Sequence, residues 1–234
     1  MRTKIASLAF LLLFAAASPP ALADGAKPFI TAQDLDLTLF LAPPPADDSA
    51  QTRRELGEVL TYQVTRTPDM EERAKADVTE DIWRFADVMG PKFDKATLPR
   101  VAAFFERVTE TEGAVVDPAK DIWHRPRPHK LSDLVRPAVK ISNSGAYPSG
   151  HATVGTLMGI VLANMVPEKR AEIMARAWDY ANNRVVGGIH YRSDIEAGRI
   201  AGSLIAATII AREDFRTGFA EARSELRDAF GLAK

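Results

Sequence analysis

Basic side chains gather in a short segment near the middle of the chain. The segment Lys120-Asp-Ile-Trp-His-Arg-Pro-Arg127-Pro128 brings a lysine and two arginines together at the expected end of a helix. Pro126 and Pro128 restrict the backbone around Arg127, so its guanidinium has little conformational entropy left to lose. A planar guanidinium matches two phosphate oxygens at once, and a lysine adds a compact charge. The segment indicates a phosphate site, although a solvated basic helix end has the same composition.

A second segment, Tyr147-Pro148-Ser149-Gly150-His151, directly precedes a strongly apolar stretch. Ser149 suits the N-cap of a helix, and Gly150 lets an anion approach the backbone closely. The free amides of a first helical turn carry partial positive charge and bind anions. His151 would then stand beside the bound anion, but taken alone it fits equally well a solvated histidine at a helix start.

The third segment, Arg184-Val-Val-Gly-Gly-Ile-His190-Tyr-Arg-Ser-Asp194, combines a cation, an imidazole and an acid. With His190 four residues before Asp194, the carboxylate can accept a hydrogen bond from one ring nitrogen. The other nitrogen is then free to act as a nucleophile. An ordinary surface His–Asp pair is one alternative. A metal site is disfavoured, because the chain has four histidines, no His-x-His pair and three cationic side chains nearby.

In this order the three segments resemble the signature of the phosphatidic acid phosphatase type 2 (PAP2) superfamily: Lys-x6-Arg-Pro, Pro-Ser-Gly-His and Ser-Arg-x5-His-x3-Asp. All the internal spacings agree. The resemblance is closest to the bacterial class A nonspecific acid phosphatases, which are exported, small and helical. It covers essentially the mature chain and is specific mainly over residues 120–198. Asn183 departs from the signature, since the superfamily usually has Ser at this position.

The resemblance implies a role for each of these side chains in a metal-independent phosphomonoesterase without a cofactor. His190 would attack phosphorus to give a phosphohistidine, Asp194 would orient it, and His151 would protonate the leaving oxygen and later activate water. The phosphoryl oxygens would be held by Lys120, Arg127, Ser149, Gly150 and Arg184. Small phosphate monoesters are the expected substrates, with inorganic phosphate and vanadate as inhibitors.

Three other functions use similar chemistry. Vanadium haloperoxidases share the constellation, but they are typically much longer than this chain. A lipid phosphate phosphatase is the nearest alternative among hydrolases. An exported phosphate-binding protein would need the cationic side chains but not a His–Asp pair aimed at the anion.

Composition limits the remaining possibilities. The chain has 234 residues, of which 46% are hydrophobic and 26% charged, as is usual for a globular domain. It contains no cysteine, which excludes a disulfide scaffold, a zinc–thiolate site and a cysteine nucleophile. The formal net charge of -1 gives no electrostatic reason to expect nucleic acid binding.

The N-terminus has the features of a secretory signal peptide. Arg2 and Lys4 precede the apolar stretch 5–17, and Ala21-Leu22-Ala23 has the form of a cleavage site. We therefore expect a signal peptide over 1–23, cleavage after Ala23, and a periplasmic or secreted acid phosphatase domain over 24–234. The apolar stretches 154–166 and 200–211 are too short to span a membrane, so no span is expected in the mature chain. A homo-oligomer is left open.

Helical patterns must position these residues. We expect helices over 49–65 and 69–89, one from Pro99, one after Ser149, one over 168–186, and a last one from Ser193 to beyond Phe230. Ser193 and Glu196 suit a capping box for this last helix. No period-two alternation of strand length is evident. The sequence predicts an all-α protein, a single compact helical domain with a central helix bundle as its core.

Overall fold

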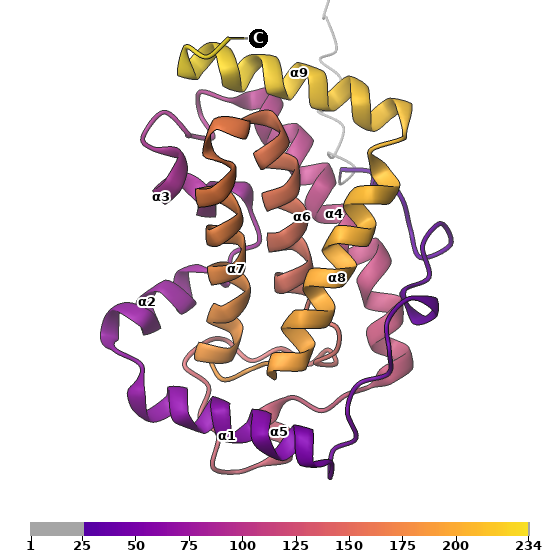
Figure 1. Cartoon of the computed structure of the whole chain (residues 1–234), viewed down its shortest axis with the longest axis vertical. Coiled ribbons are helices and arrows are strands. Elements are labelled where there is room, and N and C mark those ends of the chain that lie inside the picture. Colours follow the sequence, from indigo (N-terminus) through magenta and orange to yellow (C-terminus); the bar gives the residue numbers. More distant parts are fainter. Residues whose placement is uncertain (1–25, 234) are drawn as a thin grey trace, which may run out of the picture.

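The computed structural model describes residues 26–233, and the regular elements in this part of the chain are all helices (Figure 1). The α-helices are α1 (Ala50–Thr65), α2 (Pro68–Ala76), α3 (Ala86–Met89), α4 (Pro99–Trp123), α5 (Pro128–Leu131), α6 (Gly150–Met165), α7 (Arg170–Val186), α8 (Arg192–Ile209) and α9 (Glu213–Phe230). Short 3-10 helices occur at η1 (Leu37–Leu39), η2 (Ile82–Phe85) and η3 (Pro167–Lys169). The predicted all-α class is confirmed. The expected signal peptide, 1–23, lies outside the described residues.

Helix α6 is the centre of the bundle. It is apolar around its whole circumference, and almost all of its side chains are buried. A helix of this kind is stable only when other helices surround it. Helices α4, α7 and α8 pack against α6, and Figure 1 shows α6 between α7 and α8. The predicted bundle core is therefore present, and the apolar stretch 154–166 forms part of it.

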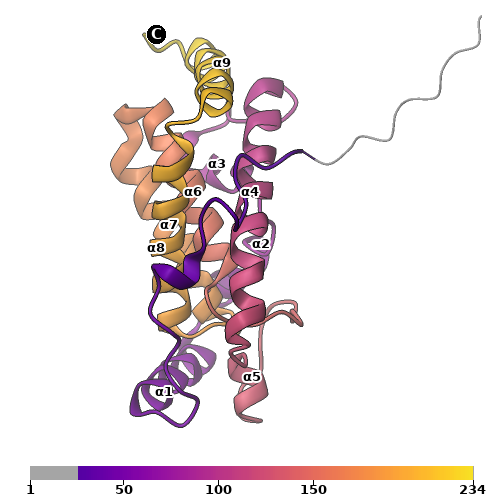
Figure 2. The same cartoon turned by 90° about the vertical axis from the view of Figure 1, so that its right-hand side faces the viewer.

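The three functional segments lie at one end of this bundle. Helices α6 and α8 begin there, and α4 and α7 end there. Helix α1 lies near this end, whereas α9 crosses the opposite end; Figure 2 shows the same arrangement from the side. Backbone hydrogen bonds join the segments: the amide of Ala146 donates to Arg125 O (2.9 Å), and the amide of Ser149 donates to Asp194 O (3.0 Å).

The prediction of one continuous helix over 69–89 is wrong. Helix α2 ends at Ala76, and a loop of residues 77–81 precedes η2 and α3. The break is stabilised by Asp77, whose buried carboxylate accepts hydrogen bonds from Arg84 (3.0 Å), Arg176 (2.6 Å) and Asn183 (2.8 Å). Two of these donors come from α7, and together with Arg84 they outweigh the local helical pattern.

The expected last helix differs from the structure at both its start and its length. It begins at Arg192, and its N-cap amide, that of Tyr191, donates to the Asp194 carboxylate at 2.8 Å. Asp194, and not the predicted Ser193–Glu196 pair, therefore satisfies the helix start. The chain also turns after Ile209, so that α9 is a separate helix packed against α4. The apolar residues of α9 are buried against the end of the bundle. A straight continuation of α8 would leave them exposed.

Glycines let α8 approach α6 unusually closely. A Cβ atom added at Gly198 would lie 2.5 Å from Ser149 O, and one at Gly202 would lie 2.5 Å from Thr153 O. Both distances are far shorter than van der Waals contact. The close approach fixes the start of α6 beside the start of α8, and with it the relative positions of Ser149 and Asp194.

Among the helices of residues 26–233, none is both long enough and apolar enough to span a bilayer.

The glycine contact gives a test of the fold. Gly202→Ala should lower the free energy of unfolding by about 1–3 kcal/mol, because the new methyl group overpacks the α6–α8 interface. Gly57 is the matched control: it also lies inside a helix, but a Cβ there meets no atom within 4 Å. Gly57→Ala should leave stability unchanged or raise it by up to about 1 kcal/mol. Urea unfolding followed by circular dichroism measures both, and equal midpoints for the two variants would contradict this packing.

Candidate active site

The three segments enclose a cavity of about 170 Å³ at the helix ends described above. Its wall contains six of the eight side chains or backbone positions that the sequence singled out: Lys120, Arg127, Gly150, His151, Arg184 and His190. Ser149 and Asp194 are completely buried behind the wall. Glu80, Ser142 and Ser144 complete the wall, and none of these three was predicted.

Positive charge is concentrated in this cavity. Lys120 and Arg127 come from the first segment and Arg184 from the third, and all three are buried. Arg184 has two guanidinium nitrogens, Nε and Nη1, that are buried without a hydrogen-bond partner. Burial lowers the pKa of Arg184 to about 10, which still leaves it charged at neutral pH. Buried donors normally have partners, so unpaired ones facing a cavity indicate a site for an anion.

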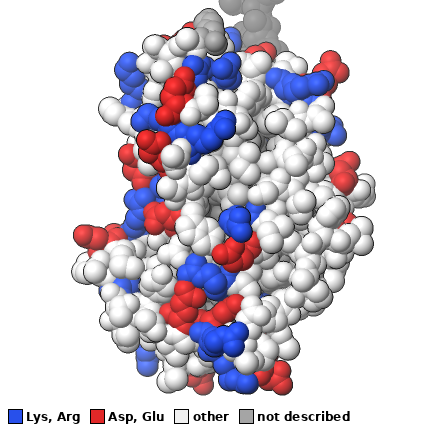
Figure 3. All heavy atoms as spheres, in the orientation of Figure 1, with Lys and Arg blue, Asp and Glu red and all other residues white. Residues whose placement is uncertain are grey.

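These three cations lie on the cavity wall, and the face shown in Figure 3 has no patch of one charge. On the face shown in Figure 3, basic and acidic residues are interspersed. Lys120 makes one described ion pair, with the exposed Asp117 at 3.1 Å. Among residues 26–233, no three His, Cys, Asp or Glu side chains are placed to hold one metal ion. In the described part of the chain, an anion in this cavity would therefore meet three buried cations.

The start of α6 contributes its backbone. Ser149 is the N-cap, and its hydroxyl accepts a hydrogen bond from the amide of Ala152 at 3.3 Å. At Gly150 a Cβ atom would lie 2.9 Å from Glu112 Oε1 and 3.1 Å from Lys120 Nζ. A side chain at this position would therefore collide with the Glu112 carboxyl group and the Lys120 ammonium group. Glycine leaves room for both. The predicted N-cap is present; the close approach of an anion to Gly150 and a direct bond from Ser149 to phosphate stay predictions.

His190 is held in one tautomer. A guanidinium can only donate, so the 3.0 Å contact between Arg127 Nη1 and His190 Nε2 requires a lone pair on Nε2. The proton then lies on Nδ1, which donates to Asp194 Oδ2 at 3.2 Å. Burial, reinforced by the charges of Arg127 and Arg184, lowers the pKa of His190 well below its usual range. The structure thus presents a neutral imidazole on the cavity wall, with the Nε2 lone pair held against Arg127.

Arg125 supports this arrangement, although it was not predicted as a site residue. It is buried, and its guanidinium donates to Asp194 Oδ1 at 2.5 Å and to Ser193 Oγ at 2.7 Å. Burial raises the pKa of Asp194 to about 7, whereas Arg125 and the amide of Tyr191 act in the opposite direction. Arg125 therefore favours the ionised carboxylate that His190 needs. Its place two residues before Arg127, in a Pro-interrupted segment, was the only signal in the sequence.

His151 has partners on both ring nitrogens. Nδ1 lies 2.7 Å from Glu80 Oε1, and Nε2 lies 3.0 Å from the carbonyl oxygen of Val78. Both partners come from the loop of residues 77–81, where the sequence predicted helix. Glu80 was therefore not predicted as a site residue, and no spacing rule connects it to His151.

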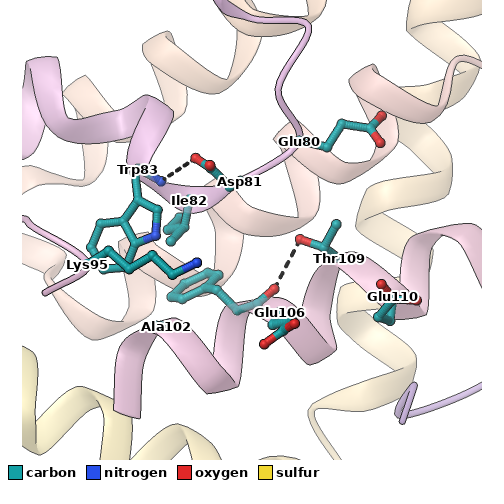
Figure 4. A pocket seen from close by; sticks show the side chains of 10 residues that line it. Glu80, Asp81, Ile82, Trp83, Lys95, Ala102, Glu106, Thr109 and Glu110 are labelled. Carbon is teal, nitrogen blue, oxygen red and sulfur yellow. Dashed lines mark hydrogen bonds between the residues drawn. The ribbon is translucent and has the colours of Figure 1, made fainter. Parts of the chain in front are cut away.

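Glu80 also borders a second hollow, of about 200 Å³, between η2 and α4. Figure 4 shows that its carboxylate extends away from Trp83 and Lys95, which line the far side of this hollow. The carboxylate is thus directed out of the hollow, consistent with its contact with His151.

Asn183 lies outside the cavity wall. Its amide nitrogen donates to Asp77 Oδ2 at 2.8 Å, within the cluster that stabilises the break after α2. In this chain the residue before Arg184 supports the loop that carries Glu80.

Comparisons with known proteins identify the family of the chain. Residues 108–217 match the model of the PAP2 superfamily. The chain is 32% identical over 208 residues to an acid phosphatase of Zymomonas mobilis, an alignment covering 83% of this chain and 76% of that one. It is 30% identical over 220 residues to a non-specific acid phosphatase of Salmonella typhimurium, covering 90% of this chain and 88% of the relative.

Solved structures show the same fold. A bacterial vanadium-dependent iodoperoxidase superimposes with a TM-score of 0.54 at 20% identity, over 72% of this chain and 51% of the peroxidase. A transmembrane PAP2-type phosphatidylglycerolphosphate phosphatase from Bacillus subtilis gives 0.50 at 16% identity, over 82% and 97%. The fold is therefore common to proteins with different chemistry, and the sequence matches carry the closer assignment. They show that the chain belongs to the PAP2 superfamily and, within it, to the acid phosphatases.

Proposed function

We propose that this chain is an exported enzyme that hydrolyses small phosphate monoesters through a phosphohistidine, without a metal ion. One observation carries the proposal: His190, with a lone pair on Nε2, lines a cavity that is also lined by three buried cations. Export is supported by the signal-like sequence of residues 1–23. The acid phosphatases that align with most of the chain support the phosphomonoester substrates.

In the first step, the phosphoryl oxygens bind Lys120, Arg127 and Arg184, and Arg127 exchanges its contact with His190 for one with the substrate. Nε2 of His190 then attacks phosphorus while the bond to the leaving oxygen breaks. The ring becomes positively charged, and Asp194 stabilises it through Nδ1. His151 donates its proton to the leaving oxygen, so an alcohol departs.

In the second step, the neutral His151 takes a proton from water, and the resulting hydroxide attacks phosphorus. The bond from phosphorus to Nε2 breaks, His190 returns to its neutral form and phosphate is released. The same three cations stabilise both transition states, because the charge on the equatorial oxygens is similar in each.

Metal independence is tested with a chelator and an anion. Hydrolysis of p-nitrophenyl phosphate by the purified protein should survive EDTA, because cationic side chains stabilise the charge that a metal ion would otherwise stabilise. Vanadate should inhibit it by occupying the same cavity. Loss of activity in EDTA that a divalent ion restores would contradict the proposal, and absence of turnover with a panel of phosphate esters would exclude it.

Asp194→Asn tests the tautomer argument. The amide keeps the size of the side chain but no longer stabilises the charged ring, so kcat should fall by about 10²–10⁴-fold, as when a catalytic carboxylate partner of histidine is neutralised in other enzymes. Glu196→Gln is the matched control: it removes a half-buried carboxylate from the same helix, and the one ion pair of Glu196 among residues 26–233 is with Arg199 at 3.1 Å. It should retain full activity. Steady-state kinetics measures both, and equal activities would show that Asp194 does not orient the nucleophile.

A further inference from the structure

We propose that Glu80 is a positioning residue for His151, and that it holds this ring as the charged proton donor of the reaction. The inference rests on the proposed function, in which His151 is the general acid. It adds a second histidine–carboxylate pair to the site, on the side of the leaving group, beside the pair formed by His190 and Asp194.

The contacts of His151 favour its protonated form, against a pKa that burial and Arg184 lower overall. The carbonyl oxygen of Val78 can only accept, so Nε2 carries a proton across that 3.0 Å contact. The carboxylate of Glu80 accepts the proton of Nδ1 across 2.7 Å. A ring that donates from both nitrogens is an imidazolium. His190 has the opposite arrangement, because one of its nitrogens faces a guanidinium donor. The two histidines of one cavity are thus set up as acid and nucleophile.

The surrounding charges explain why this acid needs a carboxylate. The groups that face His151 or its partner from neighbouring elements are Tyr180 and Arg184 of α7, Lys120 and Glu112 of α4, and His190. Burial lowers the pKa of His151, and the charge of Arg184 lowers it further. The cations that bind phosphate therefore oppose a protonated acid beside them. Only Glu80, through its hydrogen bond and its charge, and the Val78 carbonyl raise this pKa.

Glu80 is available for this task as a carboxylate. Burial favours its neutral form, but the contact with His151 and the charges of Lys120 and Arg184 outweigh burial and lower its pKa overall. The other nearby acid, Glu112, cannot replace it: burial raises the pKa of Glu112 to about 8, so it is neutral at acid pH.

The loop of residues 77–81 is braced on both sides of Glu80. Before it, Asp77 is anchored by its three donors, and the hydroxyl of Tyr180 donates to Thr79 O at 2.8 Å. After it, Asp81 Oδ1 accepts from the amide of Trp83 at 3.0 Å and caps η2. The Tyr180 ring also stacks on His151, with centroids 6.0 Å apart. The carboxylate and the ring therefore meet without a large further loss of entropy.

In the reaction, the leaving oxygen replaces the Val78 carbonyl as the acceptor of the Nε2 proton, while Nδ1 keeps its hydrogen bond to Glu80. The ring proton passes to this oxygen as the bond from phosphorus to oxygen breaks and the bond from phosphorus to His190 Nε2 forms. His151 is then neutral, and it accepts a proton from the attacking water in the second step. The restored imidazolium pairs again with Glu80.

Glu80→Gln tests the inference, since the amide oxygen can still accept from Nδ1 but the negative charge is lost. The general acid must be protonated, so kcat/KM for glycerol phosphate falls as pH rises through the pKa of His151. Without the carboxylate this pKa falls, and the basic limb should move down by about one pH unit, the scale of one close opposite charge. At pH values above the limb, the loss should be about tenfold. The p-nitrophenolate group leaves without a proton, so the same change should be much smaller with p-nitrophenyl phosphate.

Glu106→Gln is the matched control. Glu106 is an exposed carboxylate that lines the hollow bordered by Glu80, and it has no described contact with the site. Its pH profile should coincide with that of the parent protein. A Glu80→Gln profile that falls equally for both esters without a shifted limb would overturn the inference, because a structural role alone predicts that result.

A second measurement separates this inference from the proposed function. A histidine ¹⁵N NMR titration of the full chain, assigned with His151→Gln, reports the ring without requiring turnover. The pKa of His151 should be lower in Glu80→Gln than in the parent protein, and an equal pKa would overturn the inference. Failure of the parent protein to hydrolyse either ester would instead refute the proposed function. If Glu80→Gln does not fold, the parent spectrum decides: a His151 ring that is neutral throughout the acid range contradicts the imidazolium.

Discussion

Three cations buried around one cavity are the constraint on which the rest of the site depends. Burying a charge without a partner raises the free energy of the folded state. The described chain leaves two guanidinium nitrogens of Arg184 without a hydrogen-bond partner, so it does not fully offset this cost. The arrangement persists because each cation is fixed by a different structural element that is stabilised elsewhere. Lys120 lies in the last turn of α4, Arg127 in the Pro-flanked segment after it, and Arg184 in the last turn of α7. In the proposed function, a phosphoryl group supplies the missing negative charge.

The same positive charge determines how the two histidines are supported. It favours a neutral His190, which a nucleophile requires, so Asp194 is needed chiefly to orient the ring and to stabilise it once it is charged. It disfavours a protonated His151, which an acid requires, so Glu80 must supply a compensating charge. Arg125 and Asp77 act indirectly, through Asp194 and through the loop of Glu80. Arg125 favours the ionised form of Asp194, and Asp77 fixes the loop that carries Glu80.

Much of the site could be predicted from the sequence, because its residues occur in three compact segments. Local spacing was enough to place His190 against Asp194 and to identify Ser149 as the N-cap of a buried helix. The residues that were missed act across long distances in the chain. Arg125 contacts Glu55 of α1, and Glu80 reaches His151 from a loop within a region of helical pattern. Such contacts depend on tertiary packing, which no local periodicity reports.

The same reasoning explains the errors in the helices. The pattern over 69–89 is helical, but Asp77 has three donors available only in the folded protein, and these favour a break. The apolar residues after Ile209 continue the helical spacing, so the turn before α9 left no signal. At the start of α8, Ser193 and Glu196 formed a plausible capping box, whereas Asp194 both caps the helix and binds His190. A residue with two roles is hard to assign from one pattern.

The central claim, that His190 carries the phosphoryl group, is tested most directly by trapping the phosphoenzyme. The protein is mixed rapidly with a phosphate-labelled ester, quenched in alkali and digested with trypsin. Cleavage after Arg184 and Arg192 places His190 in a different peptide from His151. Mass spectrometry should find an acid-labile phosphoryl group on the peptide of residues 185–192, formed in the burst phase. A phosphoryl group on the peptide containing His151, or a product burst without any covalent phosphoprotein, would contradict the account.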